Sequence, residues 1–245
     1  DVAGVRHRLG QTALLVPVVI LVVRGNGHEE GTFRFDGGVR DFVEHLAPDG
    51  AACDPIHIVG SGNYKETVPV LDSAGHMVTQ TVERHCEVDI ALRWGTSYDT
   101  VVQSFCNVVR TGHGGSHQNG FERALTKTVN EALRTTKVLK VKDEDVTKDD
   151  VLEGLTAVIT VKVPEPQYLG QTKDELGTPG VSRIVADVIT KGLKAGFLDN
   201  RKPKAQARTG LEQVRAAAQP RQAAHAPPAA PRAKTAPQPP PPPPT

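Results

Sequence analysis

Groups that could cross-link the chain or hold a metal ion are scarce in this sequence. Its three cysteines, Cys53, Cys86 and Cys106, are odd in number and far apart, and no Cys-x-x-Cys pair occurs. Neither a disulfide framework nor a zinc site is indicated, and a reducing compartment fits this usage best. We therefore expect a cytoplasmic protein that uses none of its own side chains to hold a metal ion.

No apolar run in the sequence is long enough to span a bilayer. The most apolar stretch, "ALLVPVVILVV" at residues 13–23, is short, is interrupted by Pro17 and has no basic flank with a small-residue cleavage site. Neither sign of charge dominates, since 29 Lys and Arg stand against 28 Asp and Glu, for a net charge of +1. We expect a soluble chain with no membrane partner, in which any contact with nucleic acid is local.

Strand and helix patterns are both present in the 245 residues. With 38% hydrophobic but only 4% aromatic residues, the chain can bury a modest core. Strands are predicted at residues 13–23, 31–35, 64–71, 86–94, 100–109 and 155–163, with a polar connector between the third and the fourth. Helices are predicted at residues 5–12, 36–46, 121–132, 147–153 and 181–197. Because strands and helices mix without strict alternation, the predicted fold class is α+β.

Two of these elements have clear local signals. Residues 86–94 alternate in polarity, which is typical of a half-solvated sheet, and the apolar face is formed by Val88, Ile90, Leu92 and Trp94. Thr147 with Asp150 three residues later predicts a capped helix start, and Gly154 predicts the end of that helix.

The composition changes abruptly after Asn200. The chain becomes rich in Lys, Arg, Gln and Ala and then runs into Ala-Pro repeats that end in "PQPPPPPPT". Such a segment has too little apolar surface to offset its ordering entropy, so we expect residues 201–245 to be disordered. The sequence also begins without Met, and we expect it to be a piece of a longer protein.

A glycine-rich loop, "GHGGSH", separates a predicted strand from the clearest predicted helix, at residues 121–132. Gly114 and Gly115 would permit unusual backbone dihedrals, Ser116 would cap the helix, and His117 would form a hydrogen bond within the loop. Metal binding by His113 and His117 is the alternative, but no third or fourth ligand lies nearby in the sequence. We therefore favour a structural role for this loop.

Two long stretches, "RWGTSYDTVVQSFCNVVRTGHGGSHQNGFERALTKTVNEAL" and "KDDVLEGLTAVITVKVPEPQYLGQTKDELG", are similar to a known family. They resemble the transducer domain of the ATPase subunit of bacterial type IIA topoisomerases, in gyrase or in topoisomerase IV. The glycine-rich loop, the "EGLTAV" strand and the "GQTK" loop follow one another in the family's order, and the resemblance extends from about Val5 to about Phe197. The "LGTP" after the loop leans toward the topoisomerase IV type.

The resemblance implies a domain organisation. It implies a two-layer, ribosomal-protein-like fold, with helices on one face of a mixed sheet and one left-handed crossover. Residues 1–16 would end an ATP-binding domain that is otherwise absent, residues 17–200 would form the transducer domain, and residues 201–245 would be a tail. A DNA-cleavage domain that binds metal would follow in the family. We therefore expect the chain alone to be inactive as an ATPase.

The resemblance also implies cofactors and partners. ATP would be bound mainly by the absent domain, and Mg²⁺ is implied by the family without ligands in this chain. The partners would be DNA, the DNA-cleaving subunit of the topoisomerase, and a second copy joined through the absent ATP-binding domain.

Gln171, Thr172 and Lys173 of the "GQTK" loop are the candidate cofactor-binding residues. In the family the Gln and the Lys reach into the neighbouring domain and touch the terminal phosphate of ATP, so Lys173 and Gln171 are the candidate catalytic residues. An ammonium group is a compact point charge suited to such a phosphate, and an amide beside it can hold the attacking water. An ordinary solvated turn is the alternative.

A second candidate site would contact DNA. Positive charge gathers near the end of the predicted domain, where the family's domain lines the cavity that receives a DNA duplex, at Lys191, Lys194, Arg201, Lys202 and Lys204. Contacts of these side chains with phosphates would be non-specific and sensitive to salt. A solvated face explains the same charges equally well.

The sequence departs from the family at three places. Val18 stands where Gly usually follows the proline, His113 stands where an acid or a lysine is more usual, and the resemblance ends after about Asn200. Two other functions therefore stay open. The chain could be a non-enzymatic remnant or an adaptor whose proline tail binds an aromatic groove. It could also be the equivalent domain of a mismatch-repair ATPase, against which "GQTK" and "GGSHQNGF" argue.

Overall fold

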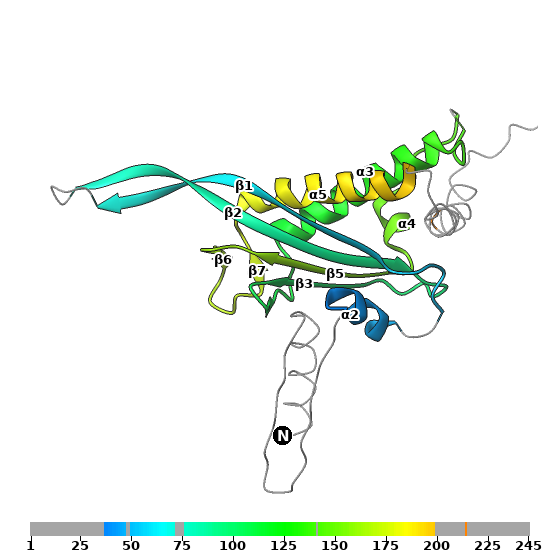
Figure 1. The fold of residues 1–245 in the computed structure, drawn as a ribbon, viewed down its shortest axis with the longest axis horizontal. Helices are drawn as coiled ribbons and strands as arrows, with labels where there is room; N and C mark the ends of the chain where they lie inside the picture. The colour runs from blue at the N-terminus through cyan, green and yellow to red at the C-terminus, as the bar shows by residue number, and fades with distance from the viewer. Residues whose placement is uncertain (1–36, 48–49, 72–75, 141, 199–213, 215–245) are drawn as a thin grey trace, which may run out of the picture.

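The computed structural model describes residues 37–47, 50–71, 76–140, 142–198 and 214 (Figure 1). Its helices are α2 (Val39–Leu46), α3 (Ser116–Thr135), α4 (Lys148–Leu152) and α5 (Pro179–Leu198). Its strands are β1 (Ile56–Leu71), β2 (Met77–Trp94), β3 (Val101–Cys106), β4 (Val109–Arg110), β5 (Leu155–Lys162), β6 (Tyr168–Leu169) and β7 (Glu175–Leu176). The predicted α+β class is confirmed. Within these ranges, no helix is long and apolar enough to cross a membrane.

Several predicted features lie outside the described residues. These are the elements at residues 5–12, 13–23 and 31–35, both proposed domain boundaries, and all but residue 214 of the proline-rich tail.

Five strands form one mixed sheet in the order β1-β2-β5-β3-β4. β5 lies in the middle, antiparallel to β2 and parallel to β3, so that Ile159 is opposite Ile90 on one side and Ser104 on the other. Seven of its eight residues are buried, because neighbouring strands cover its edges and helices cover its faces. The sheet is therefore mixed, as predicted, and is built around β5.

The two faces of the sheet are covered by different helices (Figure 1). The predicted apolar face of β2 lies in the same core as α3 and α5, together with Phe121, Leu125 and Ile189. The short helix α2 covers part of the opposite face, where Phe42 packs on Phe105 with 5.8 Å between ring centroids. The two long helices thus share one face, as expected, whereas the helix predicted at residues 36–46 lies on the other face.

β1 pairs with β2 along its whole length, from Ile56 opposite Leu92 to Leu71 opposite Met77. We call the outer part of this hairpin, residues 63–71 and 76–85, the ribbon, and Figure 1 shows it projecting beyond the body of the sheet. The predicted polar connector between two separate strands is therefore wrong. Val78, Thr79, Thr81 and Val82 let β2 extend into it, because β-branched residues suit extended backbone even where both faces are solvated.

The single strand predicted at residues 100–109 is also wrong, because β3 and β4 are separated by a turn. Asn107 and Val108 adopt left-handed backbone angles, with φ of 48° and 62°. The Asn107 side chain forms the pair of hydrogen bonds that a neighbouring strand would form with Val163. Its Nδ2 donates to the carbonyl of Val163 at 2.6 Å, and its Oδ1 accepts from the Val163 N–H at 2.9 Å. These bonds secure the turn against the end of β5.

Helix α4 has the predicted ends. The Thr147 side chain accepts from the Asp150 N–H, the Asp150 carboxylate accepts from the Thr147 N–H, and Gly154 follows the helix with φ of 70°. The helix also presents the Val151 carbonyl to the buried indole N–H of Trp94, 2.9 Å away. This bond fixes α4 to the sheet.

Candidate functional site

The segment that contains Gln171, Thr172 and Lys173 is the tip of a small β-hairpin. Its strands are β6 and β7, in which Tyr168 pairs with Leu176 and Leu169 pairs with Glu175. The chain turns through left-handed angles at Gly170 (φ 85°) and Lys173 (φ 58°), and all four residues 170–173 are exposed. We call residues 168–176 the tip hairpin. Its three candidate side chains are therefore free of the core and adjacent in space.

The base of the tip hairpin is closed by two hydrogen bonds. The Gly177 N–H donates to the Gln167 carbonyl at 2.7 Å, and the Gln167 N–H donates to Oγ1 of the buried Thr178 at 3.0 Å. The Tyr168 hydroxyl donates to the Cys106 carbonyl at 3.2 Å, and desolvation together with its contact with Cys106 raises the pKa of Tyr168. The tip therefore stands on a base that is joined to β3.

The glycine-rich loop is hydrogen-bonded to the tip hairpin. The His113 N–H donates to the Asp174 carbonyl at 2.9 Å, and the Leu176 N–H donates to the Gly114 carbonyl at 3.0 Å. Gly115 forms a β-bridge with Leu176, and a Cβ on Gly115 would lie 2.3 Å from the Leu176 carbonyl oxygen. The two segments that the sequence singled out separately thus form one unit.

The predicted backbone freedom of the glycine-rich loop is present. Gly114 and Gly115 have φ angles of 73° and 126°, which favour glycine. The predicted role of Ser116 as the helix cap is wrong, because Gly115 is the N-cap of α3 and no side chain caps it. The Ser116 Oγ is buried and has no hydrogen-bond partner among the described residues. Only a residue without a Cβ can lie this close to the Leu176 backbone. The contact with Leu176 therefore requires glycine at the N-cap of α3.

Beneath the glycine-rich loop lies a buried polar cluster. His117 has an exposed fraction of 0%, and its Nε2 lies 3.1 Å from Oγ1 of Thr111, so the predicted bond within the loop is present. Thr111 Oγ1 donates to the Ser104 carbonyl at 3.0 Å and lies 2.7 Å from Ser104 Oγ. Burial lowers the pKa of His117 to about 4, so its imidazole is neutral at physiological pH.

A metal role for the two loop histidines has no support in the geometry. His117 is fully buried, whereas His113 is exposed. In the described part of the chain, no three His, Cys, Asp or Glu side chains gather in a way that could hold a metal ion. The three cysteines are buried and form no disulfide.

Two of the candidate DNA-contacting lysines, Lys191 and Lys194, are described by the structure, and they lie in different surroundings. Lys191 lines a groove of about 610 Å³ between β1 and α5, together with Lys65, Arg183 and Asp187. Lys194 instead pairs with Glu131 on α3, with 2.7 Å between Nζ and Oε2. Lys65 and Arg183 were missed from the sequence, although the i, i+8 spacing of Arg183 and Lys191 would have placed both on one side of a helix.

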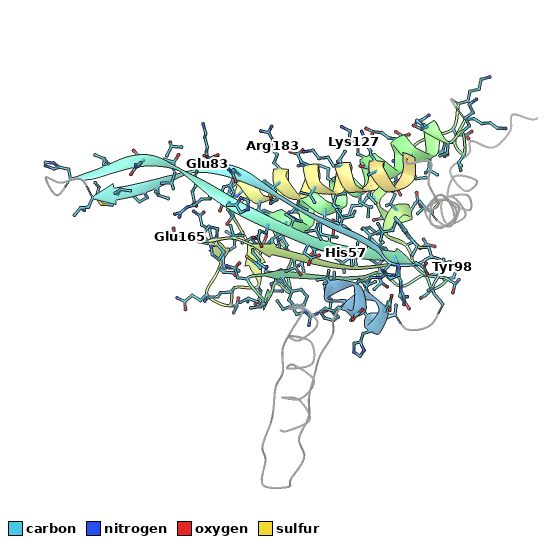
Figure 2. The ribbon with its side chains drawn as sticks, in the orientation of Figure 1. His57, Glu83, Tyr98, Lys127, Glu165 and Arg183 are labelled. Atoms are coloured by element: carbon cyan, nitrogen blue, oxygen red, sulfur yellow. The ribbon has the colours of Figure 1, made fainter. Side chains whose placement is uncertain are left out.

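Figure 2 shows Arg183 and Lys127 on the side of the helical layer that faces away from the sheet. The remaining candidates, Arg201, Lys202 and Lys204, lie outside the described residues.

The comparison with protein families gives a match to the DNA gyrase B family over residues 38–227. The DNA gyrase B protein of Mycobacterium tuberculosis (strain ATCC 25177 / H37Ra) is 38% identical over 169 residues, which are 69% of this chain and 22% of that protein. The DNA gyrase B protein of Borreliella burgdorferi is 35% identical over 191 residues, 76% of this chain and 27% of that protein. The chain thus spans about a quarter of the length of these relatives.

Solved structures show the same fold. The 43K ATPase domain of Thermus thermophilus gyrase B, crystallised with an aminocoumarin, superposes with a TM-score of 0.71 at 27% identity, over 91% of this chain and 55% of that chain. The topoisomerase IV ATP-binding domain of Francisella tularensis has a TM-score of 0.65 at 21% identity, over 91% and 54% of the two chains. The family match, the relatives and the fold agree that this chain belongs to the DNA gyrase B family.

Proposed function

We propose that this chain is the transducer segment of an ATP-hydrolysing type IIA DNA topoisomerase, and that its tip hairpin senses the terminal phosphate of ATP. The observation that supports this is the exposure of Gln171, Thr172 and Lys173 together at the tip of a hairpin whose base is bonded from two sides. We assign residues 17–200 to the transducer domain and residues 1–16 to the end of an ATP-binding domain. Such a tip can enter a pocket formed by a neighbouring domain.

The residues of the tip fit a terminal phosphate. The Lys173 ammonium is exposed on a turn that is followed by Asp174, whose backbone is fixed to His113. A charge-assisted hydrogen bond of this kind contributes about 1.5–3 kcal/mol. The Gln171 side chain carries both a donor and an acceptor, so it can bind the same oxygens or hold a water molecule in line. When bound, ATP with Mg²⁺ supplies the phosphoryl group that water attacks.

The same contact would make the tip a switch. Lys173 can make this contact only while the terminal phosphate is present, so the tip would bind the ATP state and the ADP state with different affinities. Because Asp174 and Leu176 are hydrogen-bonded to residues 113–114, a displacement of the tip would also displace the start of α3. We propose that α3 and α5 relay this change to DNA held by the complete enzyme.

DNA contact is proposed for the groove between β1 and α5. Lys65, Arg183 and Lys191 line it, and Asp187 is the acidic residue among them. Such cations would contact phosphates without reading sequence. The further partners that we propose are the DNA-cleaving subunit and a second copy joined through the ATP-binding domain.

The test is ATP hydrolysis by a complete subunit that carries this segment. Lys173→Ala should lower turnover roughly 10-fold to 100-fold, because a charge-assisted contact to the transferred group is lost. ADP binding should stay within about twofold, since ADP has no terminal phosphate for Lys173. Gln171→Ala should have a smaller effect, because positioning a water usually contributes less than balancing charge.

The matched control for Lys173→Ala is Lys162→Ala. Lys162 is an exposed lysine at the end of β5 whose Nζ lies 3.2 Å from Oε2 of Glu87. This control should behave like the wild type, because an exposed pair of this kind contributes little. Equal losses of ATP and ADP affinity in Lys173→Ala, or unchanged turnover, would contradict the proposed contact.

A further inference from the structure

Four polar side chains join the ribbon to the base of the tip hairpin. Arg84 on β2 donates from Nε to Oε2 of Glu66 on β1, 3.3 Å away, and from Nη2 to the carboxylate of Glu165, which follows β5. The second oxygen of Glu66, Oε1, accepts a hydrogen bond from Nε2 of Gln167. Glu66 and Arg84 therefore bind two positions, 165 and 167, of the segment that leads into the tip.

The ribbon side of this network is partly withdrawn from water. The side chains of Arg84 and Glu66 have exposed fractions of 16% and 10%, whereas that of Glu165 is 67% exposed. Partial desolvation strengthens the attraction between Arg84 and Glu66, and it makes the loss of either partner costly. The bond from Arg84 to Glu165 is weaker, because water competes for the exposed carboxylate.

The network meets the tip hairpin at the residue that closes its base. Gln167 accepts the Gly177 N–H and donates its own N–H to Thr178, so it fixes both strands of the hairpin. Glu66 binds the side chain of this same residue. The glycine-rich loop fixes the opposite side, through Gly114 and Leu176. The ribbon is thus the second of two supports for the tip.

The inner end of the ribbon is itself held in place. Tyr64, which lies opposite Arg84, is buried against the first turn of α5, where a Cβ on Gly180 would come within 2.6 Å of the Tyr64 side chain. A network anchored on two paired strands and a helix can fix the direction in which the tip hairpin points. An exposed turn held only by its own backbone cannot do so to the same extent.

We propose that Arg84 and Glu66 are positioning residues that fix the direction in which the tip presents Gln171 and Lys173. This inference rests on the proposed function of the tip and adds two residues that never touch the nucleotide. They act through Gln167 and the hairpin base. Catalytic contacts tolerate little displacement, so loss of this support lowers turnover even though Lys173 is still present.

Glu83 offers a matched control on the same ribbon. It directly precedes Arg84, so it points to the other face, where Asn63 donates to its Oε1 at 3.2 Å. Figure 2 shows Glu83 and Glu165 on opposite sides of the ribbon. Glu83→Gln changes the charge of the ribbon and leaves the network to Gln167 intact.

The first measurement is amide hydrogen exchange on this chain. In Arg84→Gln and in Glu66→Gln, the Gly177 and Leu176 amides should exchange at least about tenfold faster, because the base of the hairpin opens more often. Amides of α3 and β5 should keep their wild-type rates, and Glu83→Gln should match the wild type throughout. If Arg84→Gln fails to fold, Glu66→Gln, which keeps the volume of the side chain, carries the test.

The second measurement is ATP turnover by the complete subunit. Arg84→Gln should lower kcat by about fivefold to tenfold and leave ADP affinity within about twofold, because positioning affects only the contact with the terminal phosphate. In the Lys173→Ala background, Arg84→Gln should cause no further loss, since residues that act as a unit are not additive.

The outcomes separate the two proposals. Unchanged exchange at Gly177 and Leu176 in both ribbon variants would overturn the positioning role. Fully additive losses in the double variant would overturn it as well, because Arg84 would then act independently of Lys173. Faster exchange with unchanged ATP turnover in the ribbon variants, while Lys173→Ala still lowers turnover, would overturn the positioning role and keep the contact of the tip with ATP. Unchanged turnover in Lys173→Ala as well would overturn that contact.

Discussion

The glycine-rich loop at residues 112–117, with the adjoining Thr111, and the tip hairpin lie against each other and use their polar groups in opposite ways. The first buries them, since His117 and Thr111 have exposed fractions of 0% and 2% and bind each other. The second bonds through its backbone and leaves Gln171 and Lys173 in solvent. A polar loop is therefore a candidate for binding where its side chains take no part in holding the loop together. The glycine-rich loop should respond to mutation through stability, and the tip through activity.

The largest expected effect is that of Gly115→Ala. The new Cβ would lie 2.3 Å from the Leu176 carbonyl oxygen, at a φ of 126° that alanine rarely adopts. We expect a loss of about 3 kcal/mol in the free energy of unfolding, measured by urea denaturation. The control is Gly112→Ala, since a Cβ there has no neighbour within 4 Å, and it should change stability by less than about 0.5 kcal/mol. Similar losses in both variants would remove the distinction between these glycines.

The second effect is a pH dependence that His117 gives to the glycine-rich loop. Burial lowers the pKa of His117 from 6.5 to about 4, so the folded state favours the neutral ring, whereas the unfolded chain takes up a proton below pH 6.5. The stabilisation is thus fully present above pH 6.5 and is lost as the pH falls toward 4. Between pH 7 and pH 5 we expect a loss of about 2 kcal/mol. Urea unfolding at both pH values should show a smaller loss in His117→Gln, and equal losses would contradict this assignment.

A smaller effect is expected for Thr111→Val, which keeps the shape of the side chain and removes its hydroxyl. Ser104 and His117 would each lose a partner in a buried site. Leaving such groups unpaired should cost about 1.5 kcal/mol in unfolding free energy. Thermal and urea unfolding would detect this change. A neutral result would mean that the cluster rearranges around the substitution.

The smallest effect on stability should come from the tip, and it should have the opposite sign. Lys173 has a φ of 58°, which is unfavourable for lysine and accessible to glycine. After the greater backbone entropy of glycine is included, Lys173→Gly should stabilise the chain by about 0.5 kcal/mol. The same variant should lose ATP turnover in the complete subunit. If Lys173→Gly instead destabilises the chain, the Lys173 side chain contributes to the stability of the tip hairpin, and the prediction is wrong.

The sequence predicted correctly those features of the fold that depend on residues close to one another in the chain. The capping pair of Thr147 and Asp150 and the apolar face of residues 86–94 were both confirmed, because their partners lie within a few residues or on one face of one strand. The second strand of the ribbon, residues 77–85, was missed for a related reason. With both faces solvated, its residues need no apolar alternation, so a strand there resembles a polar connector.

The arrangement of the site depended on contacts between distant segments. Residue type alone favoured Ser116 as the helix cap, but the approach of Leu176, some sixty residues away in the sequence, gives that place to Gly115. The bond from Glu66 to Gln167 spans 101 residues. No local propensity contains such information, so the sequence could predict which residues form the tip but not what holds it.

The central position of β5 also has a consequence for how the chain is made. β5 joins β2 to β3, yet residues 95–154 must be synthesised between the end of β2 and the start of β5. At roughly 5–20 residues per second, the ribosome needs about 3–12 s for this stretch. Throughout that time the inner edge of β2, with Ile90 and Leu92, has no neighbouring strand. A chain that stops before Leu155 would keep that edge open permanently, and stalled translation products should aggregate through it.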